Sequence, residues 1–225
     1  MGKEGTRMKF RSVFDIIGPV MIGPSSSHTA GAARIGRAAR SLFGRLPRRV
    51  TITLYGSFAK TYRGHGTDVA LVGGLLDFDT DDERMVQALE MARESGVEIT
   101  FIESEEVADH PNTARLHLED DQGDLEVTGI SIGGGKMEIV ELNGFELRLS
   151  GSAPALLVTH HDRYGAVAKV ATVLANHRIN IGYMQVSRKE KGLEALMIIE
   201  TDQYVDDPIQ REISSLEDIT GVTVL

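Results

Sequence analysis

The stretch HDRYGAVAKVATVLANHRINI, residues 161–181, contains a helical apolar pattern that leads into a strand-forming segment. Apolar and small residues recur at helical spacing over 165–177, and residues 181–188 favour a strand. Around this stretch the expected order is strand, helix, strand, strand, helix, strand, over residues 155–159, 165–177, 181–188, 193–201, 207–217 and 222–225. This βαββαβ order is typical of a ferredoxin-like arrangement.

The segment SGSAP, residues 150–154, separates this arrangement from the preceding sequence. Its small residues and its proline break the periodicity, as linkers between domains do. We therefore expect an amino-terminal domain over 1–150 and a carboxy-terminal domain over 154–225. The predicted fold class is α+β for both parts of the chain.

Residues 1–150 combine separate strands and helices with a meander. Strands are expected over 48–54 and 97–102, and a helix over 82–95 that ends at Gly96. Apolar and polar residues then alternate over 116–149. Three turn signals interrupt this alternation, at residues 121–123, 133–135 and 143–144. Alternation with turns at these intervals predicts an antiparallel meander.

The composition is that of an ordinary acidic protein. The chain has 225 residues, of which 41% are hydrophobic and 25% are charged, with a formal net charge of -9. An acidic surface opposes binding to a phosphate backbone. No apolar run approaches the roughly 18 residues that a membrane helix needs, and the polar start MGKEGTRMKF is unlike a secretory signal. We expect a cytoplasmic protein that binds neither nucleic acid nor membranes.

The chain contains no cysteine. It therefore forms no disulfide and cannot hold an iron–sulfur cluster by thiolates of its own.

Two motifs resemble ligand sites without meeting their requirements. In GGGKM the glycine spacing of a phosphate loop is absent and Met137 replaces the hydroxyl residue, which predicts a hairpin turn. Adjacent side chains of the segment HHD, residues 160–162, point to opposite faces of a strand, so we expect no metal site there.

The segment GPSSSHT, residues 23–29, is unusually rich in hydroxyl groups and runs into the helical sequence AGAARIGRAARSLF. A single serine or threonine is enough to cap a helix, with a stabilisation on the order of 1 kcal/mol. Helix N-termini and hydroxyls also donate hydrogen bonds to anions, so the segment suits a small carboxylate or phosphate. The residues alone leave both interpretations open.

The segment GHGTD, residues 64–68, places His65 between two glycines. Glycines allow the backbone to approach a ligand, and they are expected to leave the imidazole exposed as an acid or base. The simpler interpretation is a loop histidine beside a helix that Thr67 or Asp68 caps. These two interpretations also remain open at the level of the residues.

Taken together, the segments IGPVMIGPSSSHTAGAARIGR and SFAKTYRGHGTDVALVGGLLDF resemble the beta chains of bacterial iron–sulfur L-serine dehydratases. The stretch at 161–181 resembles the signature of ACT domains, with Tyr164 where that family usually has proline. Related folds occur as the allosteric substrate-binding domain of some phosphoglycerate dehydrogenases, but the GHGTD segment favours the dehydratase. The expected architecture is an α+β serine dehydratase beta domain followed by a βαββαβ ACT domain.

The resemblance implies a beta subunit that converts L-serine to pyruvate and ammonia together with an alpha subunit. The alpha subunit would ligate a 4Fe-4S cluster whose open iron acts as a Lewis acid on the substrate hydroxyl. The implied catalytic residues are His65, Thr67 and His28. The implied substrate-binding residues are Ser25, Ser26, Ser27 and Thr29.

ACT domains commonly bind a free amino acid between two copies, or hold subunits together. The resemblance implies a homodimeric contact through this domain and a regulatory site in its loops, at Asp162, Arg163, Asn180 and Ile181. Two alternatives to a catalytic subunit remain open. The chain can be a non-catalytic module that senses serine for another enzyme, or a structural partner that stabilises the alpha subunit.

Overall fold

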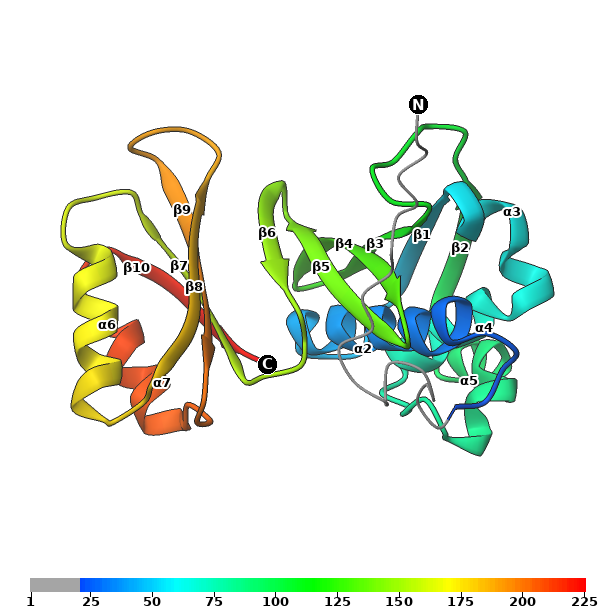
Figure 1. Cartoon of the computed structure of the whole chain (residues 1–225), viewed down its shortest axis with the longest axis horizontal. Coiled ribbons are helices and arrows are strands. Elements are labelled where there is room, and N and C mark those ends of the chain that lie inside the picture. Colours follow the sequence, from blue (N-terminus) through cyan, green and yellow to red (C-terminus); the bar gives the residue numbers. More distant parts are fainter. Residues whose placement is uncertain (1–20) are drawn as a thin grey trace, which may run out of the picture.

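Two β-sheets form the framework of residues 21–225, the part of the chain that this computed structural model describes (Figure 1). One sheet has six strands in the order β2-β1-β3-β4-β5-β6, and the other has four in the order β10-β7-β9-β8. Helices accompany both sheets, which confirms the α+β fold class. The expectation about the polar start of the chain concerns residues 1–20, which lie outside the described residues.

The six-stranded sheet joins one parallel pair to an antiparallel meander. β1 and β2 pair in parallel, and every other neighbouring pair is antiparallel. The strands are β1 (Arg49–Tyr55), β2 (Glu98–Glu103), β3 (Asn112–Asp120), β4 (Gly123–Gly133), β5 (Lys136–Leu142) and β6 (Phe145–Leu149). The predicted strands and the predicted meander are confirmed. The meander begins earlier than expected because Thr113 and Ala114 already pair with both β1 and β4.

Helical segments connect and cover this sheet. They are the π-helical turn η1 (Ser26–Ala30), α2 (Gly31–Phe43), α3 (Gly56–His65), α4 (Thr67–Leu75), the 3₁₀ turn η2 (Glu83–Gln87) and α5 (Ala88–Glu94). The helix predicted over 82–95 exists, but its first turn is the 3₁₀ turn. Asp82 caps this turn by accepting a hydrogen bond from the N–H of Arg84 at 2.9 Å.

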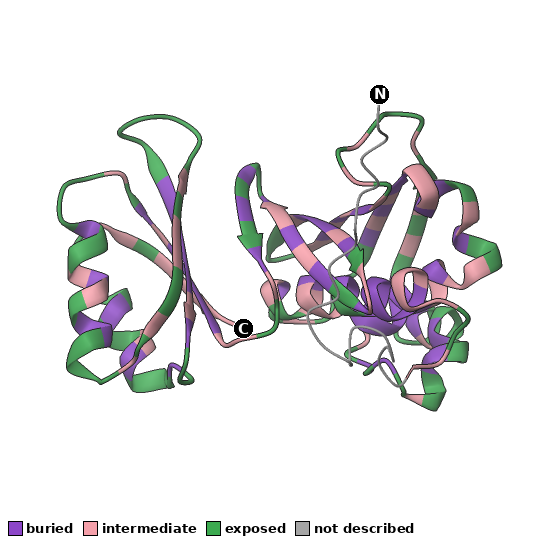
Figure 2. Ribbon diagram, viewed as in Figure 1, coloured by how far each residue is buried: buried purple, intermediate pink, exposed green. Residues whose placement is uncertain are grey.

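Glycines allow α2 and α4 to approach each other closely. A Cβ atom on Gly36 would lie 2.1 Å from the carbonyl oxygen of Leu71, and one on Gly74 would lie 2.0 Å from that of Ala33. No side chain fits at such separations, so the two backbones are in direct contact. Buried residues concentrate where these helices cross beneath the sheet (Figure 2).

The four-stranded sheet has the predicted βαββαβ order. Its elements are β7 (Ala155–His161), α6 (Ala166–Asn176), β8 (Ile181–Arg188), β9 (Glu194–Thr201), α7 (Asp207–Ser214) and β10 (Ile219–Val224). α6 and α7 cover one face, where apolar side chains form a separate core that includes Leu156, Val170, Met197 and Ile213.

The other face of this sheet packs against the six-stranded part. Leu157, Leu196 and Ile198 belong to the same buried cluster as Phe145 and Leu149 of β6. Residues 195–199 of β9 are therefore all buried. Their side chains alternate between the face that packs against the helices and the face that packs against β6. Among residues 21–225, no helix is long and apolar enough to cross a membrane.

Candidate active site

The hydroxyl-rich segment forms one helical turn, η1. η1 continues directly into α2, and Ser25 caps it by accepting a hydrogen bond from the N–H of His28 at 3.3 Å. The cap that the simpler interpretation expected is therefore present. The remaining hydroxyls have other contacts: Ser27 Oγ lies 3.0 Å and Ser25 Oγ 3.4 Å from Nδ1 of His28.

The other nitrogen of His28 contacts a residue from a distant part of the chain. Nε2 lies 3.0 Å from Oγ of Ser57, which stands in the first turn of α3. The N–H of Ser57 donates to the carbonyl oxygen of Pro111 at 2.7 Å, which fixes this turn against the start of β3. Phe58 packs edge-on against the His28 ring, with ring centroids 5.3 Å apart. Both nitrogens of His28 therefore have hydroxyl partners, and an apolar ring limits its movement.

Ser57 is not among the site residues predicted from the sequence. The signal that could have identified it is its position two residues after the end of β1, because polar groups at the carboxyl ends of parallel strands often line sites in α/β sheets. The residue also lies in the first turn of α3, and its hydroxyl is therefore held in a defined position.

His65 lies at a junction between two helices and is half-buried, instead of exposed in a loop. α3 ends at His65, Gly66 adopts the left-handed conformation with φ 69°, and α4 starts at Thr67. This sharp junction directs the His65 ring towards His28, with ring centroids 4.8 Å apart and the planes nearly perpendicular. The two histidine motifs therefore meet at one place.

Thr29 and Thr67 lie behind these histidines and are both buried. Thr29 donates a hydrogen bond from Oγ1 to the carbonyl oxygen of His65 at 3.5 Å, and so links η1 to the end of α3. Thr67 does not cap α4, because its Oγ1 has no hydrogen-bond partner among the described residues. Nδ1 of His65 is likewise buried without a partner there. Such unused hydrogen-bonding capacity is uncommon in protein interiors and is characteristic of functional sites.

The electrostatic environment favours the neutral form of His28. Burial lowers its pKa below the ordinary value of 6.5, and the positive charge of a protonated His65 lowers it further. A neutral imidazole offers one donor and one acceptor to its hydroxyl neighbours. The site thus combines two imidazoles that can carry protons with hydroxyls that can bind an anionic group.

The four residues predicted to be regulatory lie at two separate places in the part of the chain that the four-stranded sheet supports. Asp162 accepts hydrogen bonds from Arg188 at 3.0 Å and from the N–H of Gly192 at 2.9 Å. Arg163 pairs with Asp218 at 3.2 Å, before α6 begins.

The other two, Asn180 and Ile181, follow the end of α6. Asn180 donates to Asp202 at 2.7 Å, and Ile181 is the first residue of β8. The 11 residues of α6 separate the two loops by about 16 Å, so one copy of the chain does not bring them together.

Two expectations about other motifs are confirmed. Residues 133–136 form the tight turn between β4 and β5, as the hairpin interpretation of GGGK predicted. His160 is buried and His161 is exposed, so adjacent side chains of β7 face opposite sides. Glu103, Glu105 and Glu106 are exposed. No group of three or more histidine, aspartate or glutamate side chains within residues 21–225 could hold a metal ion.

Sequence comparisons match each part of the chain to a described family. A profile described as "Serine dehydratase beta chain" matches residues 12–95, and one described as "ACT domain" matches residues 155–218. The chain is 63% identical over 216 residues to "Probable L-serine dehydratase, beta chain" of Bacillus subtilis, covering 96% of this chain and 98% of that protein. It is 35% identical over 212 residues to "L-serine dehydratase, beta chain" of Peptoniphilus asaccharolyticus, covering 93% and 95%.

Two further similarities are more limited. The chain is 30% identical over 176 residues to a D-3-phosphoglycerate dehydrogenase of Bacillus subtilis, covering 78% of this chain and 34% of that protein. Among solved structures, it is similar to an ACT domain from the GTP pyrophosphokinase of Chlorobium tepidum, with a TM-score of 0.26 and 13% identity. That similarity covers 32% of this chain and 95% of the solved one.

Proposed function

Because this chain belongs to the serine dehydratase beta chain family, we propose that it is the beta subunit of an L-serine dehydratase and contributes residues to the active site. The observation that carries the proposal is the meeting of the two motif histidines, His28 and His65, at 4.8 Å between ring centroids. The unpartnered atoms of His65 and Thr67 beside them support a site that is completed by a ligand or a partner.

The reaction removes water from L-serine. A base takes the α-proton, the β-hydroxyl leaves, and the resulting aminoacrylate tautomerises and hydrolyses to pyruvate and ammonia. We assign acid–base catalysis to His65, with the Thr67 hydroxyl beside it. A positioned histidine typically contributes about 100- to 10,000-fold to such a proton transfer.

His28 and the serine hydroxyls act on the substrate carboxylate in this proposal. Ser25, Ser26, Ser27 and Thr29 belong to η1 or precede it directly, so their positions are fixed relative to His28. The neutral imidazole of His28 donates a hydrogen bond from one nitrogen and accepts one at the other. Ser57 positions this ring through its contact with Nε2, and the ring in turn orients the serine hydroxyls at Nδ1.

The iron–sulfur cluster of such an enzyme does not fit this chain. The sequence has no cysteine, and the described residues contain no alternative group of ligands. We therefore propose that a cysteine-bearing alpha subunit holds a 4Fe-4S cluster and completes the site. The contribution of this chain is to bind and orient the substrate and to move a proton at the α-carbon.

The ACT part is proposed to pair two copies of the chain. The Asp162 loop and the Asn180 loop lie at opposite ends of α6, so they can share one amino acid only if a second copy supplies the other loop. This arrangement supports a homodimer with a regulatory site between ACT domains. It also supports domain limits of 1–150 and 154–225, because each part has its own sheet.

A second candidate function is a non-catalytic module that senses serine or assists assembly. The similarity to D-3-phosphoglycerate dehydrogenases favours it, because the match spans 78% of this chain but only 34% of that enzyme. The two candidates differ in one measurable property, which is turnover in the presence of the cysteine-bearing partner.

The experiment is anaerobic co-purification of the chain with that partner, followed by an assay of pyruvate formation from L-serine. Turnover that depends on both chains, and that falls when His65 is changed to glutamine, supports the catalytic subunit. Turnover that persists after both histidine motifs are altered supports the assembly module instead.

A further inference from the structure

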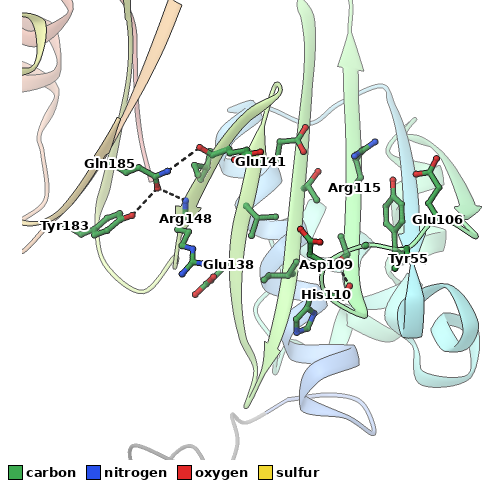
Figure 3. A pocket seen from close by; sticks show the side chains of 18 residues that line it. Tyr55, Glu106, Asp109, His110, Arg115, Glu138, Glu141, Arg148, Tyr183 and Gln185 are labelled. Atoms are coloured by element: carbon green, nitrogen blue, oxygen red, sulfur yellow. Dashed lines mark hydrogen bonds between the residues drawn. The ribbon is translucent and has the colours of Figure 1, made fainter. Parts of the chain in front are cut away.

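A groove with a volume of about 860 Å³ lies on the face of the six-stranded sheet that α2 and α4 do not cover (Figure 3). The alternation along β3 and β4 separates the two faces: Leu116 and Val127 are in the core, whereas their neighbours Arg115 and Thr128 line the groove. The groove is distinct from the candidate active site, because none of its lining residues belongs to η1, α3 or α4.

Strand register arranges the floor of the groove in two transverse rows. In the first row Arg115 of β3 pairs with Thr128 of β4, which in turn pairs with Glu141 of β5. In the second row Thr113 pairs with Ile130, and Ile130 pairs with Glu138. Neighbouring strands lie about 5 Å apart, so the first row presents a polar group at roughly that interval.

A β-bulge places the acidic end of both rows in the groove. The register shifts between Thr128 and Gly129, because Thr128 pairs with Glu141 while Gly129 pairs with Ile139. Val140 is the additional residue, and it lines the groove together with the two flanking acidic residues, Glu138 and Glu141. Bulges often redirect side chains next to binding sites in this manner.

Two polar atoms on this floor are buried and have no hydrogen-bond partner within residues 21–225. They are Oγ1 of Thr128, a residue with only 6% of its surface exposed, and Nε of Arg115. The closest acidic partner of Arg115 is Glu126, at 4.0 Å, which is too long for a hydrogen bond. A buried donor that the protein leaves unpaired is costly, and a bound ligand with an acceptor group removes that cost.

The surrounding groups select the charge of that ligand. The groove walls carry the carboxylates of Glu106, Asp109 and Glu146 in addition to Glu138 and Glu141, and no ion pair among the described residues neutralises them. Arg115 and Arg148 are the arginines that line the same groove. A simple anion is repelled by the carboxylates, and a simple cation leaves the unpaired Nε of Arg115 without an acceptor. A ligand that carries both charges satisfies both ends of the row.

The far end of the groove is formed by the other sheet. Gln185 of β8 accepts hydrogen bonds from the Tyr183 hydroxyl at 3.1 Å and from the N–H of Arg148 at 3.0 Å, and it donates to the carbonyl of Glu146 at 3.4 Å (Figure 3). These contacts join β8 to β6. Residues of both sheets therefore line the groove.

We propose that this groove binds a small α-amino acid, with its carboxylate on Arg115 and Thr128 and its ammonium group on the carboxylates of Glu138 and Glu141. The proposal goes beyond the proposed lyase activity and does not depend on it, because no residue of the candidate active site takes part. It also differs from the regulatory site between ACT loops, which lies around α6.

The test uses the full chain labelled with ¹⁵N and titrated with each of the common L-amino acids in turn. We expect at least one of them to shift the Arg115 Nε–H and Thr128 amide resonances. Its N-acetyl derivative, which lacks the ammonium group, and its methyl ester, which lacks the carboxylate, are expected to bind at least about tenfold more weakly.

Two variants test the assigned contacts. Arg115→Met is expected to weaken binding at least about tenfold, since a hydrogen bond to a charged group is lost. Thr128→Val removes only an unpartnered hydroxyl from the free protein, so it keeps the fold while it weakens binding. Arg211→Met, at an exposed arginine on α7, is the matched control and is expected to leave binding unchanged.

Two further variants separate this groove from the other sites. A chain with both His28→Ala and His65→Ala, and a chain with Asn180→Ala, are expected to retain the groove shifts. The proposal is overturned if no amino acid shifts these resonances, if the blocked derivatives bind as well as the parent, or if Thr128→Val binds normally. Loss of binding in the histidine or Asn180 variants would place the ligand elsewhere and overturn it as well.

Discussion

Replacement of Ser57 by alanine tests how the candidate active site holds His28. The change removes the hydroxyl that lies 3.0 Å from Nε2 and leaves the backbone contact of Ser57 with Pro111 intact. His28 then keeps its hydroxyl neighbours at Nδ1 but loses the partner that fixes the opposite side of its ring. We expect the complex with the alpha subunit to assemble normally.

The magnitude follows from the type of contact. A hydrogen bond between neutral groups contributes about 0.5–1.5 kcal/mol, which corresponds to a reduction in rate of about 2- to 12-fold when the bond supports the transition state. The assay is steady-state pyruvate formation by the two-chain complex across pH, for wild type, Ser57→Ala and Ser57→Thr. The threonine variant retains the hydroxyl and should recover most of the activity.

A positioning role of Ser57 also predicts which kinetic parameters the alanine change affects. Because His28 is proposed to bind the substrate carboxylate, the alanine change should raise KM for serine and should shift the acidic limb of the pH profile. Unchanged kinetics would refute the contact as a functional one. A loss above about 100-fold, the range of a lost acid or base, would contradict a positioning role and make Ser57 a catalytic residue.

Four other outcomes are expected. Because the chain has no thiolate, it should contain no iron and form no pyruvate when it is purified without the alpha subunit, as measured by metal analysis and an anaerobic assay. An active preparation of this chain alone that contains iron would contradict this. His28→Ala should weaken serine binding at least as much as it slows turnover, and a pure loss of turnover would instead identify His28 as the base. Because burial lowers the pKa of His28, its imidazole takes up a proton in the unfolded state at a higher pH than in the folded state. The free energy of unfolding, measured in urea, should therefore fall as the pH drops below the ordinary pKa of 6.5. His28→Gln should make the free energy of unfolding less dependent on pH. Truncation after Ser150 tests the ACT part through oligomeric state and serine saturation: identical curves with a lost dimer indicate an assembly device, whereas a lost sigmoid shape with a retained dimer indicates a sensor.

Local patterns were sufficient to predict much of the fold. Alternation along residues 116–149 and glycine turns such as Gly144 define the meander without reference to the rest of the chain. The βαββαβ order could also be predicted, because each element has its own periodicity and its own terminating residues. The exact form of the serine segment could not, since Ser25 caps a π-helical turn that begins at Ser26, four residues before the expected helix.

Contacts between distant segments were outside the reach of local patterns. The meeting of Ser57 with His28 depends on the pairing of β1 with β3, which sets the position of Pro111 against the start of α3. The direction of the His65 ring depends on the left-handed Gly66, and the row from Arg115 to Glu141 depends on a bulge at Val140. Such arrangements follow from register and tertiary packing, which single-segment propensities do not contain.

The most direct measurement of the central claim is single-turnover pyruvate formation from L-serine by the anaerobic two-chain complex carrying His65→Gln. The matched control is His161→Gln, at an exposed histidine on β7. We predict a loss of at least about 100-fold for the first variant, with assembly unchanged, and wild-type turnover for the second. Near-normal turnover of a correctly assembled His65→Gln complex would contradict the proposed role of this chain in catalysis.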